Sequence, residues 1–284
     1  MNMKIVFIGY DYTLDIASQL IADGHDIIQI YTFNCDNILS FNTQTKSFSD
    51  QLGIPISEGK IGSNNIEHLI NKGAEIFICA GYPHKIPPID HNKAYGINIH
   101  PSLLPRARGI MPLPFIIMHE PQAAGFTIHK LDTEFDTGEI LYQEAIEIDN
   151  TTDIESLSAR IAVRAPNAVS RIVKDIKSSW ENAKPQNDKL SSFYNAPSVE
   201  ERLVNWNEKA KELSIKALAF GRFGMIANVT NNMNETQKLA VFQFTTWEEE
   251  HVYKPGTLVR SSSREIIITI KDGYACLKEF QVLE

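Results

Sequence analysis

Short apolar runs alternate with amphipathic stretches over the first half of the chain, and this alternation most restricts the possible folds. Residues 4–8 form an apolar run closed by Gly9, and a helix-period stretch over 13–22 leads to a second apolar run over 26–33. Strands that alternate with helices in this way indicate an α/β domain built around a mostly parallel sheet. The later segments predicted as strands are 75–79, 96–100, 126–131 and 139–148.

The pattern changes after a predicted long helix over 153–176. With 284 residues and roughly 150 residues per domain, we expect two domains. A polar stretch with two prolines reads as a linker, and the remainder alternates one helix with short strands bounded by Pro-Gly and Asp-Gly turns. We therefore predict an α/β Rossmann-like domain over 1–180, a linker over 181–204 and a small β-rich, OB-like domain over 205–284.

Composition excludes several classes of protein. An apolar fraction of 43% supplies ample core, which argues against a disordered chain. The 27 basic and 35 acidic residues give a net charge of −8, which disfavours nucleic acid as the main partner. The cysteines lie too far apart in sequence to indicate a disulfide framework or a zinc site. Without a signal-peptide pattern or a membrane-length apolar run, we expect a soluble, cytoplasmic protein.

Familiar phosphate-binding and metal-binding motifs are missing from the sequence. Gly9 stands alone after the first predicted strand, so the three-glycine dinucleotide fingerprint is absent. There is also no Gly-Lys-Ser/Thr phosphate loop and no helix with paired histidines around a glutamate. A nicotinamide-dependent oxidoreductase is therefore disfavoured, and no metal site is predicted.

The segment 98–109 (Asn-Ile-His-Pro-Ser-Leu-Leu-Pro-Arg-Ala-Arg-Gly) has the densest set of candidate functional residues. Asn98 and His100 differ by two positions, so they point to the same face of a strand. Pro101 ends that strand at its carboxyl end, where α/β sheets collect their ligands. An isolated Asn-x-His is more often a polar strand end, and Asp136-Thr137-Gly138 alone is an ordinary turn, but the two together favour a functional site.

These motifs resemble the family of 10-formyltetrahydrofolate-dependent formyltransferases. The resemblance rests on Asn-x-His, the Ser-Leu-Leu-Pro run at 102–105, Arg108-Gly109 and the later Asp136-Thr137-Gly138. It extends to the second domain, where Asn205-Trp206 precedes a helix as the family's Asp-Trp does. The resemblance implies 10-formyltetrahydrofolate as co-substrate, no metal, and catalysis by Asn98, His100 and Asp136.

The implied chemistry suits these residue types. In formyl transfer an amine attacks a formamide-like carbonyl through a tetrahedral oxyanion. The Asn98 amide can stabilise the oxyanion, a role whose removal costs about a hundredfold to a thousandfold in rate. His100 can relay the proton from the amine to the folate nitrogen, and Asp136 can orient the imidazole.

The resemblance also implies residues for the two substrates. The folate is expected against the loops 80–86 and 131–136, and the acceptor near the loop after residue 100. The predicted folate-binding residues are Ala80, Tyr82, Ile86, Leu104, Leu131, Glu134 and Asp136. The predicted acceptor-binding residues are Ser102, Arg106, Arg108 and Gly109.

The acceptor amine is left open between two branches of this family. The branch that formylates methionyl initiator tRNA has a basic insertion after the second strand, whereas residues 34–50 contain only Lys46 as a basic residue. We therefore expect a small amine, in first place a nucleotide-diphosphate-linked amino sugar of lipopolysaccharide O-antigen biosynthesis, and a homodimer like the family's sugar enzymes. The alternatives are methionyl-tRNA, another small amine such as hydroxyornithine, and a folate-binding protein without transferase activity.

Overall fold

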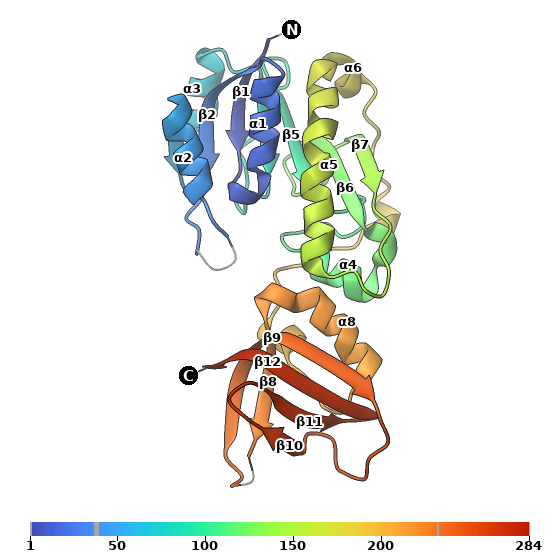
Figure 1. Ribbon diagram of the computed structural model, residues 1–284. Helices are drawn as coiled ribbons and strands as arrows, with labels where there is room; N and C mark the ends of the chain where they lie inside the picture. The colour runs from blue at the N-terminus through green and yellow to red at the C-terminus, as the bar shows by residue number, and fades with distance from the viewer. Residues whose placement is uncertain (1, 37–39, 232, 284) are drawn as a thin grey trace. The chain divides into compact units, whose positions relative to one another are not determined.

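The computed structural model describes residues 2–283 except 37–39 and 232, and the chain divides into two compact units (Figure 1). The first unit contains Met1–Pro112, Gln122–Glu147 and Ser158–Asn195. The second contains Leu113–Pro121, Ile148–Leu157 and Ala196–Glu284. The expected linker over 181–204 is shared between the two units, and the domain boundaries stay a prediction.

The first unit contains a seven-stranded sheet, which confirms the predicted α/β fold class. Its strand order is β3-β2-β1-β4-β5-β6-β7, parallel from β3 to β5, whereas β6 and β7 each run antiparallel to the preceding strand. The strands are β1 (Lys4–Ile8), β2 (Asp26–Thr32), β3 (Ile56–Glu58), β4 (Ile76–Ala80), β5 (Tyr95–His100), β6 (Gly125–Lys130) and β7 (Ile140–Ala145).

The helices follow the expected alternation with the strands, with some additions. The α-helices are α1 (Leu14–Ala22), α2 (Thr43–Leu52), α3 (Ser63–Asn71), α4 (Leu113–His119), α5 (Ile154–Lys174), α6 (Ile176–Glu181), α7 (Val199–Arg202) and α8 (Ala210–Phe220). The 3₁₀ turns are η1 (Asp11–Thr13), η2 (Pro121–Ala123), η3 (Asp188–Leu190) and η4 (Gly221–Phe223). The long helix predicted over 153–176 is α5, which ends at Lys174 because Asp175 leaves the helical conformation and is the N-cap of α6.

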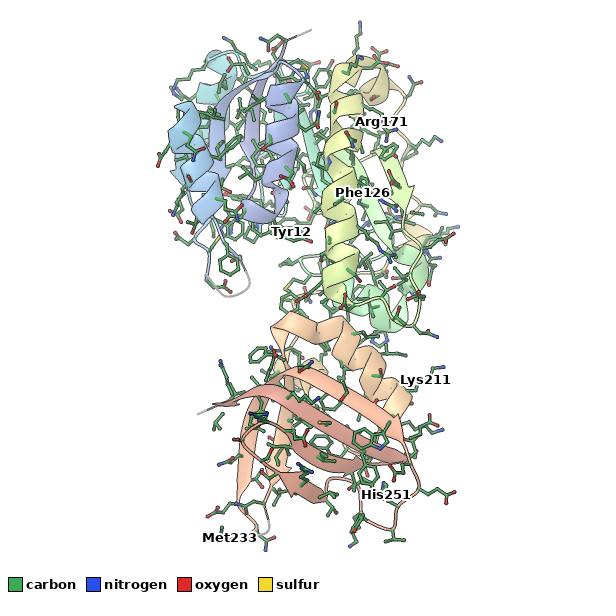
Figure 2. All side chains as sticks on the ribbon, viewed as in Figure 1. Tyr12, Phe126, Arg171, Lys211, Met233 and His251 are labelled. Atoms are coloured by element: carbon green, nitrogen blue, oxygen red, sulfur yellow. The ribbon has the colours of Figure 1, made fainter. Side chains whose placement is uncertain are left out.

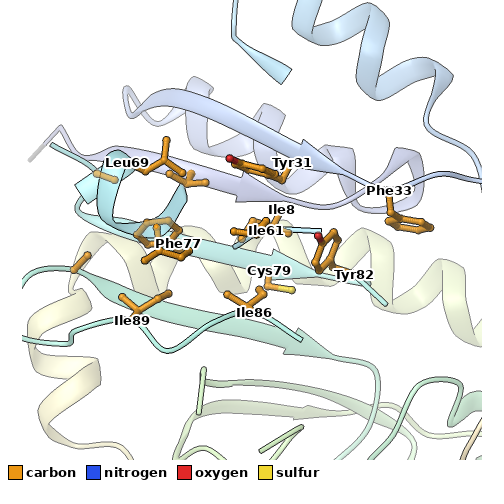
Figure 3. Packing of buried hydrophobic residues seen from close by; sticks show 14 residues of the cluster. Ile8, Tyr31, Phe33, Ile61, Leu69, Phe77, Cys79, Tyr82, Ile86 and Ile89 are labelled. Carbon is orange, nitrogen blue, oxygen red and sulfur yellow. The ribbon is translucent and has the colours of Figure 1, made fainter. Parts of the chain in front are cut away.

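A buried apolar cluster packs α3 against one face of the parallel strands (Figure 3). Val6 and Ile8 of β1 and Phe77 of β4 meet Ile66 and Leu69 of α3 there. Alternate residues of β1 point to the other face, because side chains alternate along a strand. Both faces of these strands are buried, which explains why they read as continuous apolar runs.

The helix α2 lies in a segment that reads as polar coil in the sequence. The Asp11 carboxylate accepts hydrogen bonds from the backbone N–H groups of Gln44 and Thr45, at 3.0 and 2.8 Å, and from the Thr45 hydroxyl at 2.8 Å. These N–H groups belong to the first turn of α2, where a carboxylate satisfies free donors and complements the helix dipole. The helix therefore depends on a residue about thirty positions earlier.

The long helix α5 contacts β7 through its basic side chains. Arg171, labelled in Figure 2, has its guanidinium 5.3 Å from the centre of the Tyr142 ring, and Arg164 pairs with Glu144 at 3.3 Å. None of the described helices has the length and apolar character required to cross a membrane.

The second unit contains a five-stranded antiparallel sheet in the order β10-β11-β12-β9-β8, which confirms the predicted β-rich C-terminal domain. Its core joins Leu213 and Phe220 of α8 to Val241, Ile268 and Leu277 of the sheet. The strands are β8 (Met225–Thr230), β9 (Thr236–Glu248), β10 (Leu258–Ser261), β11 (Ile266–Ile270) and β12 (Gly273–Leu283).

Candidate active site

The pairing of β5 with β6 brings a histidine to the predicted catalytic asparagine. In this antiparallel pair Asn98 lies directly opposite His129, and His100 lies opposite Thr127. Residues opposite each other in neighbouring strands share a face of the sheet. The sequence pattern predicted no partner for His129. In the structure its Nε2 lies 3.0 Å from the Asn98 side-chain nitrogen.

The hydrogen bonds of His129 fix the orientation of Asn98. Its Nδ1 lies 2.8 Å from the Lys130 carbonyl oxygen, which can only accept, so Nδ1 carries a proton. In the tautomer with this one proton, Nε2 accepts a hydrogen bond from the Asn98 amide. The same amide nitrogen lies 3.5 Å from Oδ1 of Asp136. Asn98 is thus oriented by two groups from other segments.

His100 is buried, with both ring nitrogens beside polar groups. Its Nε2 donates a hydrogen bond to the Ala107 carbonyl at 2.8 Å, and its Nδ1 faces Oδ1 of Asp136 at 3.4 Å. Burial lowers the pKa of His100 below its ordinary value, although the Asp136 carboxylate partly opposes this shift. The neutral ring therefore carries its proton on Nε2, and any further proton must bind Nδ1, next to Asp136.

The Asp136 carboxylate connects the candidate catalytic groups. Its Oδ2 accepts the backbone N–H of Gly109 at 2.9 Å, and its Oδ1 lies 3.7 Å from Nε2 of His129. Burial alone would raise the pKa of Asp136, but the charge of His100 and hydrogen bonds from its neighbours, the Gly109 N–H among them, lower it to about 2. Asp136 is therefore a buried anion at neutral pH.

The structure places the predicted acceptor-binding residues in the loop between β5 and α4. Ser102 is buried and its hydroxyl donates to the Arg106 carbonyl at 2.7 Å, while Arg106 is half-buried. The guanidinium of Arg108, 9% exposed as a residue, bonds to Gln186 and Asp188. Contacts within the protein thus hold Ser102 and Arg108, and their role in binding an acceptor stays a prediction.

Gly109, another predicted acceptor-binding residue, contacts a candidate catalytic side chain through its backbone. Its φ of +108° and a position where a Cβ would lie 2.0 Å from the Tyr194 carbonyl oxygen both require glycine. The Gly109 N–H donates to Oδ2 of Asp136 at 2.9 Å.

The predicted folate-binding residues lie on several segments of the first unit. Ala80 ends β4, and Leu104 is buried in the loop after β5. Tyr82 and Ile86 belong to the apolar cluster of Figure 3, and the Tyr82 hydroxyl donates to the Gly59 carbonyl. Their role with folate stays a prediction.

The other three predicted folate-binding residues, Leu131, Glu134 and the Asp136 described above, lie in the loop that follows β6. Leu131 is half-buried, and its backbone N–H donates to the Gly96 carbonyl at 2.8 Å. Glu134 is exposed and pairs with Lys85 at 3.5 Å. Their role with folate also stays a prediction. Within the described part of the chain, no three His, Cys, Asp or Glu side chains are grouped as metal ligands would be.

Comparison with known families gives matches in both units. Residues 42–173 match the family described as Formyl transferase, and residues 198–284 match Formyl transferase, C-terminal domain. Among curated proteins, methionyl-tRNA formyltransferase of Staphylococcus aureus (strain MW2) is 23% identical, and the alignment covers 98% of this chain and 91% of that protein.

Solved structures resemble this fold over its whole length. HypX from Aquifex aeolicus in complex with tetrahydrofolic acid matches 100% of this chain with a TM-score of 0.74 and 16% identity, but this chain spans only 45% of HypX. The N-formyltransferase from Helicobacter canadensis, in complex with folinic acid and dTDP-3-aminofucose, matches 99% of this chain and 100% of its own with a TM-score of 0.68 and 14% identity.

Proposed function

Because this chain belongs to the formyl transferase family through both of its domains, we propose that it transfers a formyl group from 10-formyltetrahydrofolate to the amine of a nucleotide-linked amino sugar. The observation that carries the reaction type is the group formed by Asn98, His100 and Asp136. The His100 Nδ1 and the Asn98 amide nitrogen lie 3.4 and 3.5 Å from the same carboxylate oxygen. A polarising donor and a proton acceptor are thus adjacent.

The chemistry of the surrounding residues fits a folate co-substrate. Phe135 and Ile110, the chain neighbours of Asp136 and Gly109, are large apolar residues with 46% and 60% exposure. Exposed apolar side chains next to buried polar groups suit a flat heteroaromatic ring whose polar edge needs partners. The predicted binding loops 80–86 and 131–136 follow β4 and β6 of the same sheet. HypX and the Helicobacter canadensis enzyme were both solved with folates.

The proposed reaction moves one proton from the amine to the folate. The amine nitrogen attacks the formyl carbon. The Asn98 N–H that makes the longer contact, 3.5 Å to Oδ1 of Asp136, turns to the formyl oxygen and stabilises the negative charge that develops there. The attacking nitrogen loses a proton, which His100 accepts at Nδ1 beside the Asp136 anion. The same proton passes to N10 of the folate as its bond to carbon breaks. The products are the formamide and tetrahydrofolate.

The charge distribution supports a small acceptor. Lys46, the basic residue of segment 34–50, pairs with Glu58 at 3.0 Å, so its charge is already compensated. The second unit has an acidic run at Glu248–Glu250 and the whole chain a net charge of −8. A tRNA acceptor requires several lysine and arginine contacts to phosphates. A nucleotide-linked sugar of lipopolysaccharide O-antigen biosynthesis requires far fewer.

A panel of acceptors tests this function. We expect a mass gain of one formyl group on at least one nucleotide-linked amino sugar when the protein is mixed with 10-formyltetrahydrofolate. The His100→Asn variant should give at least a hundredfold less product, because it lacks the proton acceptor. No product with any amine, or full activity of His100→Asn, would refute the proposal.

Methionyl-tRNA is the second candidate acceptor, because the curated relative from Staphylococcus aureus covers nearly the whole chain. Binding to a polyanion weakens steeply with salt, by about 10³-fold or more between 50 and 200 mM for six or more phosphate contacts. We expect turnover with the sugar acceptor to change much less than this over the same range. Formylation of methionyl-tRNA with a steep loss in salt would replace the sugar assignment.

A further inference from the structure

Residues 184–194, here called the strap, run beside both loops of the candidate site. The strap begins where Lys184 and Ile140 exchange backbone hydrogen bonds of 2.8 and 2.9 Å, at the start of β7. Near its end, the Ser192 carbonyl accepts the Arg108 N–H at 2.9 Å, and the Tyr194 N–H donates to the Arg108 carbonyl at 2.8 Å. The strap is therefore attached to the loop after β5 and to the strand after Asp136.

Between these attachments, Gln186 reaches the backbone around Asp136. Its Nε2 donates to the carbonyl oxygens of Asp136 and Gly138, both at 2.8 Å. The two carbonyls belong to a tight turn: Asp136 has a φ of +58°, and a Cβ at Gly138 would lie 1.9 Å from the Lys130 carbonyl oxygen. Few non-glycine residues adopt a positive φ, so external contacts are needed to hold it.

Arg108 fixes which way the Gln186 amide points. Its Nε and Nη2 donate to Oε1 of Gln186 at 3.2 and 2.7 Å. Since a guanidinium can only donate, the atom facing it must be the amide oxygen, and the two amide hydrogens must face the carbonyls. The next residue, Gly109, donates its N–H to Oδ2 of Asp136. Two adjacent residues of one loop thus hold Asp136. Gly109 binds its carboxylate directly, and Arg108 holds its backbone through Gln186.

From these contacts we infer that Gln186 is a positioning residue that holds the Asp136 turn, and so the carboxylate, against His100 and Asn98. The effect on catalysis rests on the proposed formyl transfer. The positioning itself can be measured without any substrate, through the protonation of His100, because the Asp136 carboxylate faces Nδ1 of that ring.

The test compares two variants with a neighbour in the strap. Gln186→Met keeps the length of the side chain without any N–H donor, and Gln186→Glu keeps an oxygen for Arg108 but also has no donor for the carbonyls. We expect kcat for formyl transfer to fall about a hundredfold in both, the cost of about 1 Å of misplacement, with KM changed less than about threefold. In Gln186→Met the NMR titration of His100 should also move to lower pH, because the carboxylate that raises its pKa moves away.

Asn187→Ser is the matched control, since Asn187 is exposed and its side-chain oxygen accepts from the Lys189 N–H within the strap. It should leave both kcat and the His100 titration at wild-type values. An unmoved His100 titration in folded Gln186→Met would overturn the inference, whether or not kcat falls. If Gln186→Met does not fold, unchanged kcat in folded Gln186→Glu overturns it. If the wild-type protein transfers no formyl group, the proposed function fails while the titration still decides the role of Gln186.

Discussion

Asp136→Asn is expected to lower kcat by up to about 10⁴-fold, the size of effect seen when the carboxylate paired with a catalytic imidazole is neutralised. The substitution keeps the shape of the side chain but removes the charge that faces Nδ1 of His100 at 3.4 Å. An asparagine amide cannot stabilise the imidazolium that forms during proton transfer. Steady-state kinetics with the accepted amine would measure the loss, and a decrease of less than tenfold would contradict the assigned role.

For the same variant, the pKa of His100 predicts the direction in which the pH profile of the reaction changes. His100 acts as a base only when neutral, and burial already lowers its pKa below its ordinary value, so activity should fall only at acid pH. Because the Asp136 anion raises the pKa of His100, its removal should move the residual acid limb of kcat/KM to still lower pH.

Asp149→Asn is a matched control. Hydrogen bonds from Thr151 and Thr152 lower the pKa of this aspartate to about 2 as well, but it is fully exposed in the turn before α5. This control should keep wild-type activity and its acid limb.

Asn98→Ala is expected to reduce kcat by about 10²–10³-fold, because it removes the donor proposed to stabilise the oxyanion. KM for both substrates should change little, since the lost interaction strengthens only as charge develops on the formyl oxygen. His129 then loses the partner that donates to its Nε2 at 3.0 Å, so thermal unfolding must be measured alongside the kinetics.

Asn92→Ala serves as the comparison for this variant. Asn92 is exposed in the turn before β5, where its side chain contacts Asp90. It should retain wild-type kcat and stability. A loss in Asn98→Ala that appears in KM with kcat unchanged would instead assign Asn98 to ground-state binding.

The sequence predicts the local part of the site better than its long-range part. The two-residue spacing of Asn98 and His100 places them on one face of a strand, and the structure has both at the end of β5. The pairing of His129 with Asn98 could not be predicted in this way, because the 24 residues between β5 and β6 allow either strand direction. Only the antiparallel register places His129 opposite Asn98.

The same distinction between local and long-range contacts applies to the fold. The apolar runs predicted β1, β2 and β4 closely, because buried parallel strands have a strong local pattern. The helix α2 was missed, since its first turn depends on the Asp11 carboxylate from a distant loop. The strap was read as part of a linker because its polar side chains bond mainly to backbone groups, and such contacts leave no periodic signal.

The register of β5 and β6 also bears on how this scaffold could change its substrate. Asn98 and His129 are neighbours because the backbones of two interior strands are hydrogen-bonded, so their contact does not depend on the length or composition of the surface loops. Insertions, deletions or grafted loops around the sheet would reshape what is recognised while the amide–imidazole contact persists. Acceptor choice can therefore diverge or be engineered without rebuilding the reactive centre.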